Sequence, residues 1–151
     1  MKVIVAGSRN ITDENLIFRI LSTIHIKHQI SITEVVSGRA KGVDSVGEKW
    51  AQNNGISTKL FPAKWNDLTA PNTLIRKNRY GDYNARAGFD RNESMAVYSD
   101  MLIAFWDGSS NGTAHMIQTA KKHKLTVFLY TTYDQALSMW KDGYLTLIIQ
   151  I

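Results

Sequence analysis

The segment from Met101 to Thr113 constrains the fold more than any other stretch of this sequence. Six mostly apolar residues, 101–106, predict a buried strand. Residues 107–112, Asp-Gly-Ser-Ser-Asn-Gly, predict a tight turn, because glycine and asparagine tolerate positive φ. Thr113 is the predicted N-cap of a helix over residues 114–123. Such an arrangement can bind an anion at the helix N-terminus, although an ordinary strand-to-helix connection has the same pattern.

Two further turns of this kind follow predicted strands earlier in the chain. Residues 2–6 predict a short buried strand, and Gly7-Ser8-Arg9-Asn10 follows as a turn. Residues 33–36 predict a second strand, followed by a glycine-bearing turn that runs from Ser37 to Asp44. Other strands are expected over residues 57–61, 126–130 and 144–149, and other helices over residues 13–26 (capped by Asp13), 43–53, 91–98 and 133–140.

This alternation of strands and helices predicts an α/β fold, with a mainly parallel sheet covered by helices on both faces. Ligands of such folds bind beyond the carboxyl ends of the strands. Because parallel strands end at the same edge of the sheet, we expect the turns at Gly7, Gly38 and Gly108 to lie together. The sequence therefore predicts a ligand site at this glycine-rich edge.

Several polar side chains near these turns have the chemistry of a nucleotide site. Arg9 could bind a phosphate or carboxylate with its planar guanidinium, or lie on the surface without a ligand. Asp44 could bind a ribose hydroxyl, or only complement the N-terminus of its own helix. Arg91 and Asn92 could hold a phosphate, with a structural salt bridge as the alternative. Trp65 could stack on a base at the same edge, although tryptophan more often packs in a core or an interface.

Composition limits the partners and the type of site. The 151 residues suffice for one domain with a core, and the net charge of +5 favours anionic partners without choosing between a nucleotide and a nucleic acid. The chain has no cysteine and its four histidines do not cluster, so we expect neither disulfides nor a metal site. The first apolar run is too short for a signal peptide and no segment is long enough to span a membrane, which leads us to expect a cytoplasmic protein.

Two segments stand apart from the regular pattern. Residues 66–90 lack clear periodicity and scatter aromatic side chains among arginines and lysines, and a loop of this length is usually functional or mobile. Residues 144–151 are too apolar to lie exposed to water, so they either add to the sheet or pair with another subunit. We therefore expect a homo-oligomer, with a dimer as the first hypothesis.

Five motifs occur in order along the chain: Gly7-Ser8-Arg9, Ser37-Gly38-x-Ala40-x-Gly42-x-Asp44, Pro62-Ala63-x-Trp65, Ala87-Gly88-x-x-Arg91-Asn92-x-x-Met95-Ala96, and Ala104-Phe105-Trp106-Asp107-Gly108-x-Ser110-x-Gly112-Thr113-x-His115-Met116-Ile117. In this combination the sequence resembles the YspA/YpsA-related branch of the SLOG superfamily, which occurs in bacteria and their phages. The resemblance covers residues 1 to about 130, so residues 131–151 are an extension within a single domain. It implies a Rossmann-like three-layer fold that binds a nucleotide or an ADP-ribose-like ligand at the glycine-rich edge and requires no other cofactor.

The resemblance leaves three function classes open. The superfamily includes sensors of ADP-ribose-type signals, LOG-type phosphoribohydrolases and DNA-processing proteins of the DprA type. The LOG-type enzymes have a catalytic glutamate three positions after the threonine that corresponds to Thr113, and here that position is Met116. Because a thioether cannot act as a general base, we favour a sensor or sequestering protein, although Asp44, Glu93 or Asp107 could supply another carboxylate. A nucleic-acid-binding module that uses the basic loop is the third class.

Besides Met116, the chain departs from the family pattern at residues 72–86, which form an insertion that could act as a lid. The predicted ligand-binding set is Gly7, Ser8, Arg9, Ser37, Gly38, Gly42, Asp44, Trp65, Arg91, Asn92, Asp107, Gly108, Ser109, Ser110, Gly112 and Thr113.

Overall fold

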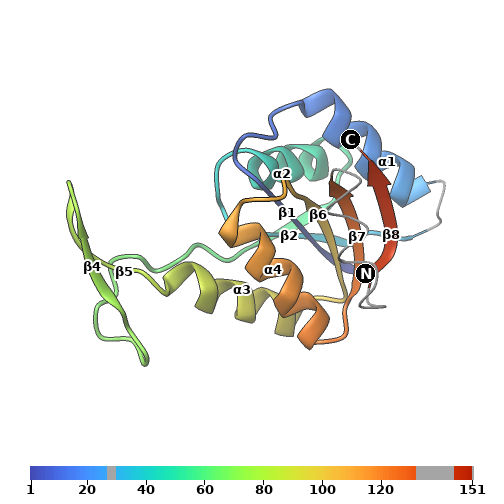
Figure 1. The fold of residues 1–151 in the computed structure, drawn as a ribbon. Helices are drawn as coiled ribbons and strands as arrows, with labels where there is room; N and C mark the ends of the chain where they lie inside the picture. Colours follow the sequence, from blue (N-terminus) through green and yellow to red (C-terminus); the bar gives the residue numbers. More distant parts are fainter. Residues whose placement is uncertain (27–29, 132–144, 151) are drawn as a thin grey trace.

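A parallel β-sheet runs through the centre of the molecule in the computed structural model, which describes residues 1–26, 30–131 and 145–150 (Figure 1). Its strands, in the spatial order β3-β2-β1-β6-β7-β8, are β3 (Ser57–Leu60), β2 (Glu34–Ser37), β1 (Lys2–Gly7), β6 (Met101–Phe105), β7 (Thr126–Thr131) and β8 (Leu145–Gln150). All five pairs of neighbours are parallel, as the alternating sequence pattern predicted. The strand order reverses between β1 and β6, and such switch points are where α/β folds bind ligands.

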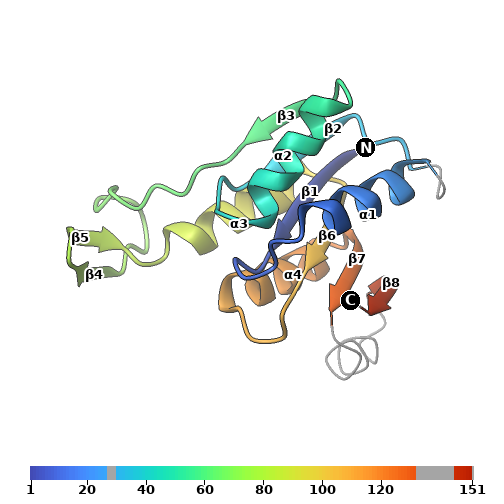
Figure 2. The same cartoon turned by 90° about the horizontal axis from the view of Figure 1, so that it is seen from above.

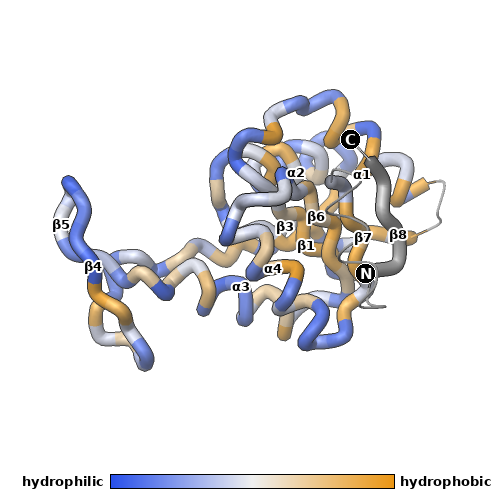
Figure 3. Tube along the Cα trace, viewed as in Figure 1, coloured by the Kyte–Doolittle hydropathy of each residue, from blue (hydrophilic) through white to orange (hydrophobic). Residues whose placement is uncertain are grey.

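Helices cover both faces of the sheet, which confirms the expected three-layer arrangement (Figure 2). Helices α1 (Glu14–Ile26) and α2 (Val43–Asn53) lie on one face, while α3 (Ala87–Tyr98) and α4 (Asn111–Lys122) lie on the other. The period-2 geometry of β1 divides its side chains between these layers: Val3 and Val5 pack toward α1 and α2, and Ile4 packs toward α3 and α4. Figure 3 shows the resulting apolar centre along the sheet.

The starts of the helices follow local capping chemistry. The Asp13 carboxylate accepts the Leu16 N–H at 3.0 Å, so Asp13 caps α1 as predicted. The predicted cap at Thr113 is wrong, because α4 already begins at Asn111, with Ser110 as its N-cap. The preceding turn is complete by Ser110, because the Asp107 carboxylate accepts the N–H groups of Ser109 and Ser110. The helix can therefore begin at the next residue, Asn111.

Twelve of the 25 residues in the predicted long loop, residues 66–90, have regular structure. The segment contains an antiparallel hairpin of β4 (Ile75–Asn78) and β5 (Gly81–Asn84), and α3 begins at Ala87, four residues before the predicted start. Every side chain of β4 is exposed, so the hairpin lacks the alternation of apolar and polar residues by which a strand is recognised in sequence. We call residues 74–86 the hairpin arm; it stands away from both helical layers (Figures 1 and 2).

The C-terminal apolar stretch adds to the sheet, which is the first of the two predicted alternatives. β8 pairs with β7 in parallel. It spans Leu145–Gln150, so both of its ends lie one residue later than the predicted bounds of 144–149. The helix predicted over residues 133–140 lies outside the described residues. None of the helices in the described ranges is long and apolar enough to cross a bilayer.

Candidate functional site

The three glycine-bearing turns meet at the carboxyl edge of the sheet, as predicted, because β1, β2 and β6 run in parallel. A cavity of about 270 Å³ opens there, between the end of β1 and the first turns of α2, α3 and α4. Nine of the sixteen predicted ligand-binding residues line it: Gly7, Arg9, Asp44, Trp65, Arg91, Asn92, Ser110, Gly112 and Thr113. Gly38 lines an adjoining recess, which shares Arg9, Trp65 and Arg91 with the cavity.

Close backbone packing explains two of the glycines. A Cβ on Gly7 would lie 2.6 Å from both the Phe105 carbonyl oxygen and the Val43 side chain. Gly42 has a φ of 86° and faces the backbone of Arg9, where a Cβ would lie 3.3 Å from the Arg9 carbonyl oxygen. Both positions let β1 and the N-terminus of α2 approach each other, and this contact forms one wall of the cavity.

The first turn of α4 forms the opposite wall. The Asp107 carboxylate accepts the N–H groups of Ser109 at 2.9 Å and Ser110 at 2.8 Å, and these bonds hold the pKa of Asp107 below its ordinary value. Ser110 makes no side-chain cap bond, so the first N–H groups of α4 are available to an anion. At Gly112 the space beside the backbone is open, since no atom lies within 4 Å of a Cβ built there.

Arg91 connects three elements at the cavity. Its Nη1 donates to the Gly38 carbonyl oxygen and its Nε donates to the Asn92 Oδ1 at 3.0 Å. The Asn92 Nδ2 in turn donates to the Gly112 carbonyl oxygen at 3.3 Å, so the Gly38 turn, α3 and α4 are tied together. Arg91 therefore braces the Gly38 turn, while its guanidinium also lines the cavity. Arg9 is exposed at the mouth, so the two guanidiniums give the cavity positive charge.

Asp44 is the one carboxylate among the described lining residues. It lies in the first turn of α2, is only 4% exposed, and accepts the Ala40 N–H at 3.3 Å. Burial raises the pKa of Asp44 to about 6, even though backbone N–H groups and Arg91 act in the opposite direction. The cavity thus contains a carboxyl group that exchanges its proton close to neutral pH.

The other two candidate carboxylates lie elsewhere. Glu93 is on α3 outside the cavity, where it contacts His123 at 2.6 Å and Lys122 at 3.3 Å. Asp107 is outside the lining and bound to its own turn. In residues 1–26, 30–131 and 145–150, no three histidine or carboxylate side chains lie together as a metal-binding group.

Sequence reasoning missed the apolar wall formed by Phe89, Met95 and Met116. Phe89 stacks on His115, with ring centroids 4.0 Å apart and an angle of 15° between the planes. The wall could have been predicted if the helix α3 had been expected to start at Ala87 and not at Arg91. A helix from Ala87 places Gly88, Arg91, Asn92 and Met95 on one face at i, i+3, i+4 and i+7, and all four line the cavity.

The remaining predicted residues build the turns around the cavity without lining it. The Ser8 Oγ accepts the Asp107 N–H at 3.0 Å, and the Ser37 Oγ donates to Glu48 at 3.1 Å. Gly108 has a φ of 87°, and Ser109 is exposed beside it. Their contacts with a ligand, like those of the lining residues, stay a prediction.

Residues 1–67 match the sequence model of the YAcAr family, the YspA, cpYpsA-related SLOG family. This match confirms the resemblance over the segment from β1 to the loop that contains Trp65. No curated protein sequence matches the chain significantly.

Solved structures with a similar fold include a DNA processing protein and a molybdenum cofactor binding protein. DNA processing protein A (DprA) from Streptococcus pneumoniae superposes with a TM-score of 0.68 at 18% identity, covering 99% of this chain and 58% of that protein. The molybdenum cofactor binding protein from Rippkaea orientalis gives a TM-score of 0.64 at 17% identity, covering 97% and 87%. Both likenesses support the Rossmann-like fold, and the chain spans somewhat more than half the length of the DprA protein.

Proposed function

We propose that this protein binds a nucleotide-derived ligand of the ADP-ribose type in the cavity at the glycine-rich edge, as a sensor or sequestering protein. One observation carries the proposal. The N-terminus of α4, which has no side-chain cap bond, and the guanidiniums of Arg9 and Arg91 line the same cavity at the switch point of the sheet. Helix N–H groups and planar guanidiniums are both ligands for phosphate oxygens.

The rest of the cavity suits the other parts of a nucleotide. Asp44, which faces these groups from α2, can accept hydrogen bonds from ribose hydroxyls when it is ionised. Trp65 and Phe89 offer aromatic surface for a base, and Trp65 is 43% exposed. The phosphate, sugar and base of one ligand would therefore contact three different parts of the wall.

Met116 favours binding over catalysis. Its side chain is buried and lines the cavity at the position where the LOG-type pattern has its glutamate. Cleavage of an N-glycosidic bond builds positive charge on the sugar, and a thioether cannot stabilise that charge or activate water. His115 does not substitute for the glutamate, because its ring packs on Phe89 and its Nδ1 lies 3.1 Å from the Asn92 Nδ2.

A second candidate function, hydrolysis of a nucleotide at its N-glycosidic bond, has one observation in its favour. The cavity still holds the Asp44 carboxyl, whose pKa of about 6 suits proton transfer near neutral pH. Among the three carboxylates considered from the sequence, only Asp44 lines the cavity.

The two functions are separated by binding and product measurements on the same sample. Protein purified from cells is analysed by mass spectrometry for a bound nucleotide, and ADP-ribose, ADP and AMP are titrated by calorimetry. We expect saturable binding of at least one phosphate-containing nucleotide and no release of free base by chromatography. No binding of any of them, with the protein folded, would contradict the proposed function. Base release that is lost in Asp44→Asn would establish the hydrolase instead.

A further inference from the structure

The hairpin arm carries most of the net positive charge of the protein. Residues 74–86 contain four basic residues, Arg76, Lys77, Arg79 and Arg86, and one acidic residue, Asp82, so the arm has a net charge of +3. The whole chain has a net charge of +5, and the other 138 residues therefore share a charge of only +2. This concentration of charge indicates an anionic partner for the arm.

Aromatic rings accompany the charge at both ends of the arm. At its base, a recess of about 500 Å³ is lined by the rings of Trp65, Tyr83 and Phe89 together with Arg76 and Arg86. The Trp65 and Tyr83 rings meet edge to face with centroids 6.4 Å apart. Trp65 and Phe89 also line the nucleotide cavity, so the recess and the cavity adjoin each other.

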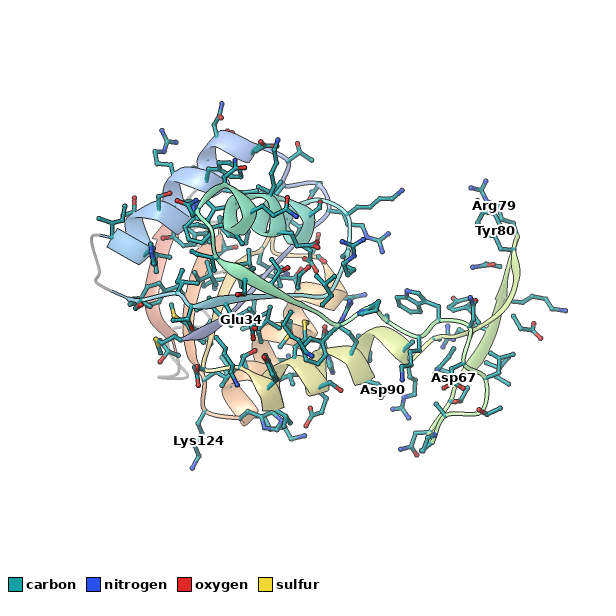
Figure 4. All side chains as sticks on the ribbon, turned by 180° about the vertical axis from the view of Figure 1, so that it is seen from behind. Glu34, Asp67, Arg79, Tyr80, Asp90 and Lys124 are labelled. Carbon is teal, nitrogen blue, oxygen red and sulfur yellow. The ribbon has the colours of Figure 1, made fainter. Side chains whose placement is uncertain are left out.

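The tip of the arm repeats the combination of arginine and aromatic ring. Arg79 and Tyr80 form the two-residue connection between β4 and β5, and Figure 4 shows both at the far end of the arm. Tyr80 is 81% exposed, and the Arg79 guanidinium lies 4.8 Å from its ring centroid. An exposed ring of this kind can stack on a base, and the guanidinium beside it can pair with a phosphate.

The arm has little support from the rest of the fold. One backbone bond joins it to the preceding loop, from Asn84 N to Trp65 O at 2.7 Å, whereas the bond from Ala85 N to Leu74 O at 2.8 Å closes the base of the arm on itself. A two-stranded hairpin without further packing is only marginally stable in water. A partner that contacts both strands would therefore order the arm as well as neutralise it.

We propose that the hairpin arm is a binding site for single-stranded nucleic acid, with phosphates on its three arginines and Lys77, and bases stacked on Tyr80 and on the aromatic rings of the recess. Exposed aromatic rings among basic side chains are the recurring pattern of such sites, because every base has a π-face and every linkage has a charge. This site is separate from the phosphate-binding part of the nucleotide cavity.

The same features argue against two other occupants. A second copy of this chain offers no strong negative counterpart, because the protein outside the arm is itself slightly positive. A lipid bilayer is disfavoured because the exposed apolar side chains Leu74 and Ile75 lie at the start of β4, whereas the far end of the arm carries Arg79 (Figure 4).

The test is fluorescence anisotropy with labelled 20-nucleotide oligo(dT) and oligo(U) and with a duplex of the same length. We expect at least tenfold tighter binding of a single strand than of the duplex, and the tighter of the two single strands identifies DNA or RNA. Four phosphate contacts predict that log K falls with log[salt] with a slope of roughly −3, at about 0.7 per contact for single strands. No saturable binding of any strand at 50 mM salt, or tighter binding of the duplex, would overturn the proposal.

Variants at the tip separate stacking from simple charge attraction. Tyr80→Ala should weaken binding at least fivefold, the lower limit for loss of one stacked base, whereas Tyr80→Phe should change it less than twofold. Arg79→Glu should weaken binding and flatten the salt slope, and Lys124→Glu is the matched control, since Lys124 lies far from the arm (Figure 4). Equal affinity in Tyr80→Ala and Tyr80→Phe would overturn the stacking site.

Further controls keep this proposal independent of the nucleotide site. The tip variants should bind ADP as the parent protein does, and Gly112→Asp should keep its affinity for the oligonucleotide. Light scattering and co-sedimentation with phosphatidylserine vesicles test the other occupants. A dimer that dissociates in Arg79→Glu, or vesicle binding that is lost in Tyr80→Ala, would assign the arm to another partner and refute the nucleic-acid site.

Discussion

Replacement of Gly112 by aspartate tests the anion site more directly than any other single change. Gly112 is the second residue of α4, and a Cβ there meets no protein atom within 4 Å. The fold should therefore tolerate the new side chain. An acidic residue in the first turn of a helix adds roughly 0.3–1 kcal/mol of stability, and loss of a helical glycine adds a similar amount. We expect the melting temperature of Gly112→Asp to equal or exceed that of the parent protein.

The effect on the ligand should be much larger and of opposite sign. Gly112 lines the cavity, so a carboxylate at this position would come close to a phosphate bound at the N-terminus of α4. Two like charges about 4 Å apart repel by about 4 kcal/mol at an effective dielectric constant of 20. At about 1.4 kcal/mol for each factor of ten, the affinity for ADP should fall on the order of 10³-fold.

Calorimetric titration of ADP into Gly112→Asp, Gly112→Asn and Gly112→Ala measures this effect. Asparagine has nearly the size of aspartate without its charge, so Gly112→Asn should lose much less affinity than Gly112→Asp. Equal losses in the two variants would attribute the effect to size. Unchanged affinity in folded Gly112→Asp, in a protein that binds ADP, would refute the placement of the phosphate at α4.

Four further predictions follow from the site and the sheet. Arg91→Ala should weaken ADP binding by roughly 1.5–3 kcal/mol, the range for a charge-assisted hydrogen bond, and calorimetry checks it; a lower melting temperature with unchanged affinity would leave Arg91 with bracing alone. Asp44→Asn should stabilise the ligand-free protein at pH 8 but not at pH 4. The folded-state pKa of about 6 lies above the ordinary 3.8, so ionisation of Asp44 opposes folding, and up to about 3 kcal/mol of stability is lost as pH rises through this window. Thermal unfolding at both pH values measures the difference, and a variant that is less stable than the parent at pH 8 would contradict it. Incubation with AMP should release no adenine, because Met116 occupies the position of the LOG-type glutamate and a thioether cannot activate water; chromatography detects any turnover. Light scattering at micromolar concentration should show a dimer, because the apolar sequence of β8 lies at an open edge of the sheet, and a clean monomer would contradict this expectation.

The elements with regular apolar spacing could be predicted from the sequence. The parallel strands, α1 and α2 were located to within one or two residues. For β1, β2, β6, β7 and the two helices the reason is that each buries a face or a core, which imposes its period on the side chains. The meeting of the Gly7, Gly38 and Gly108 turns followed from parallel strands alone. These features are set by short-range pattern and by one general rule of sheet geometry.

The parts that were missed depend on contacts that leave no period in the sequence. The hairpin arm buries little, so nothing in Ile75-Arg76-Lys77-Asn78 alternates as a half-buried strand would. The early start of α3 at Ala87 hid the position of Phe89, which stacks on a histidine of another helix. The bracing role of Arg91 depends on a carbonyl oxygen 53 residues earlier in the chain, and spacing along a sequence cannot reveal such a pair.

The pairing of β1 with β6 has a consequence for when the cavity can form during synthesis. The Lys2 N–H donates to the Asp100 carboxylate at 2.8 Å, a contact between residues 98 positions apart, and Val3 is in register with Met101. Contacts of such long range form slowly, because a large loop must close before they stabilise the chain. The nascent N-terminal half contains Gly7, Arg9 and Asp44 but lacks Arg91 and the first turn of α4. A ligand that contacts both halves would therefore bind only after translation has passed Thr113 and the two halves of the sheet have docked. It would stabilise the completed fold and not the nascent N-terminal half.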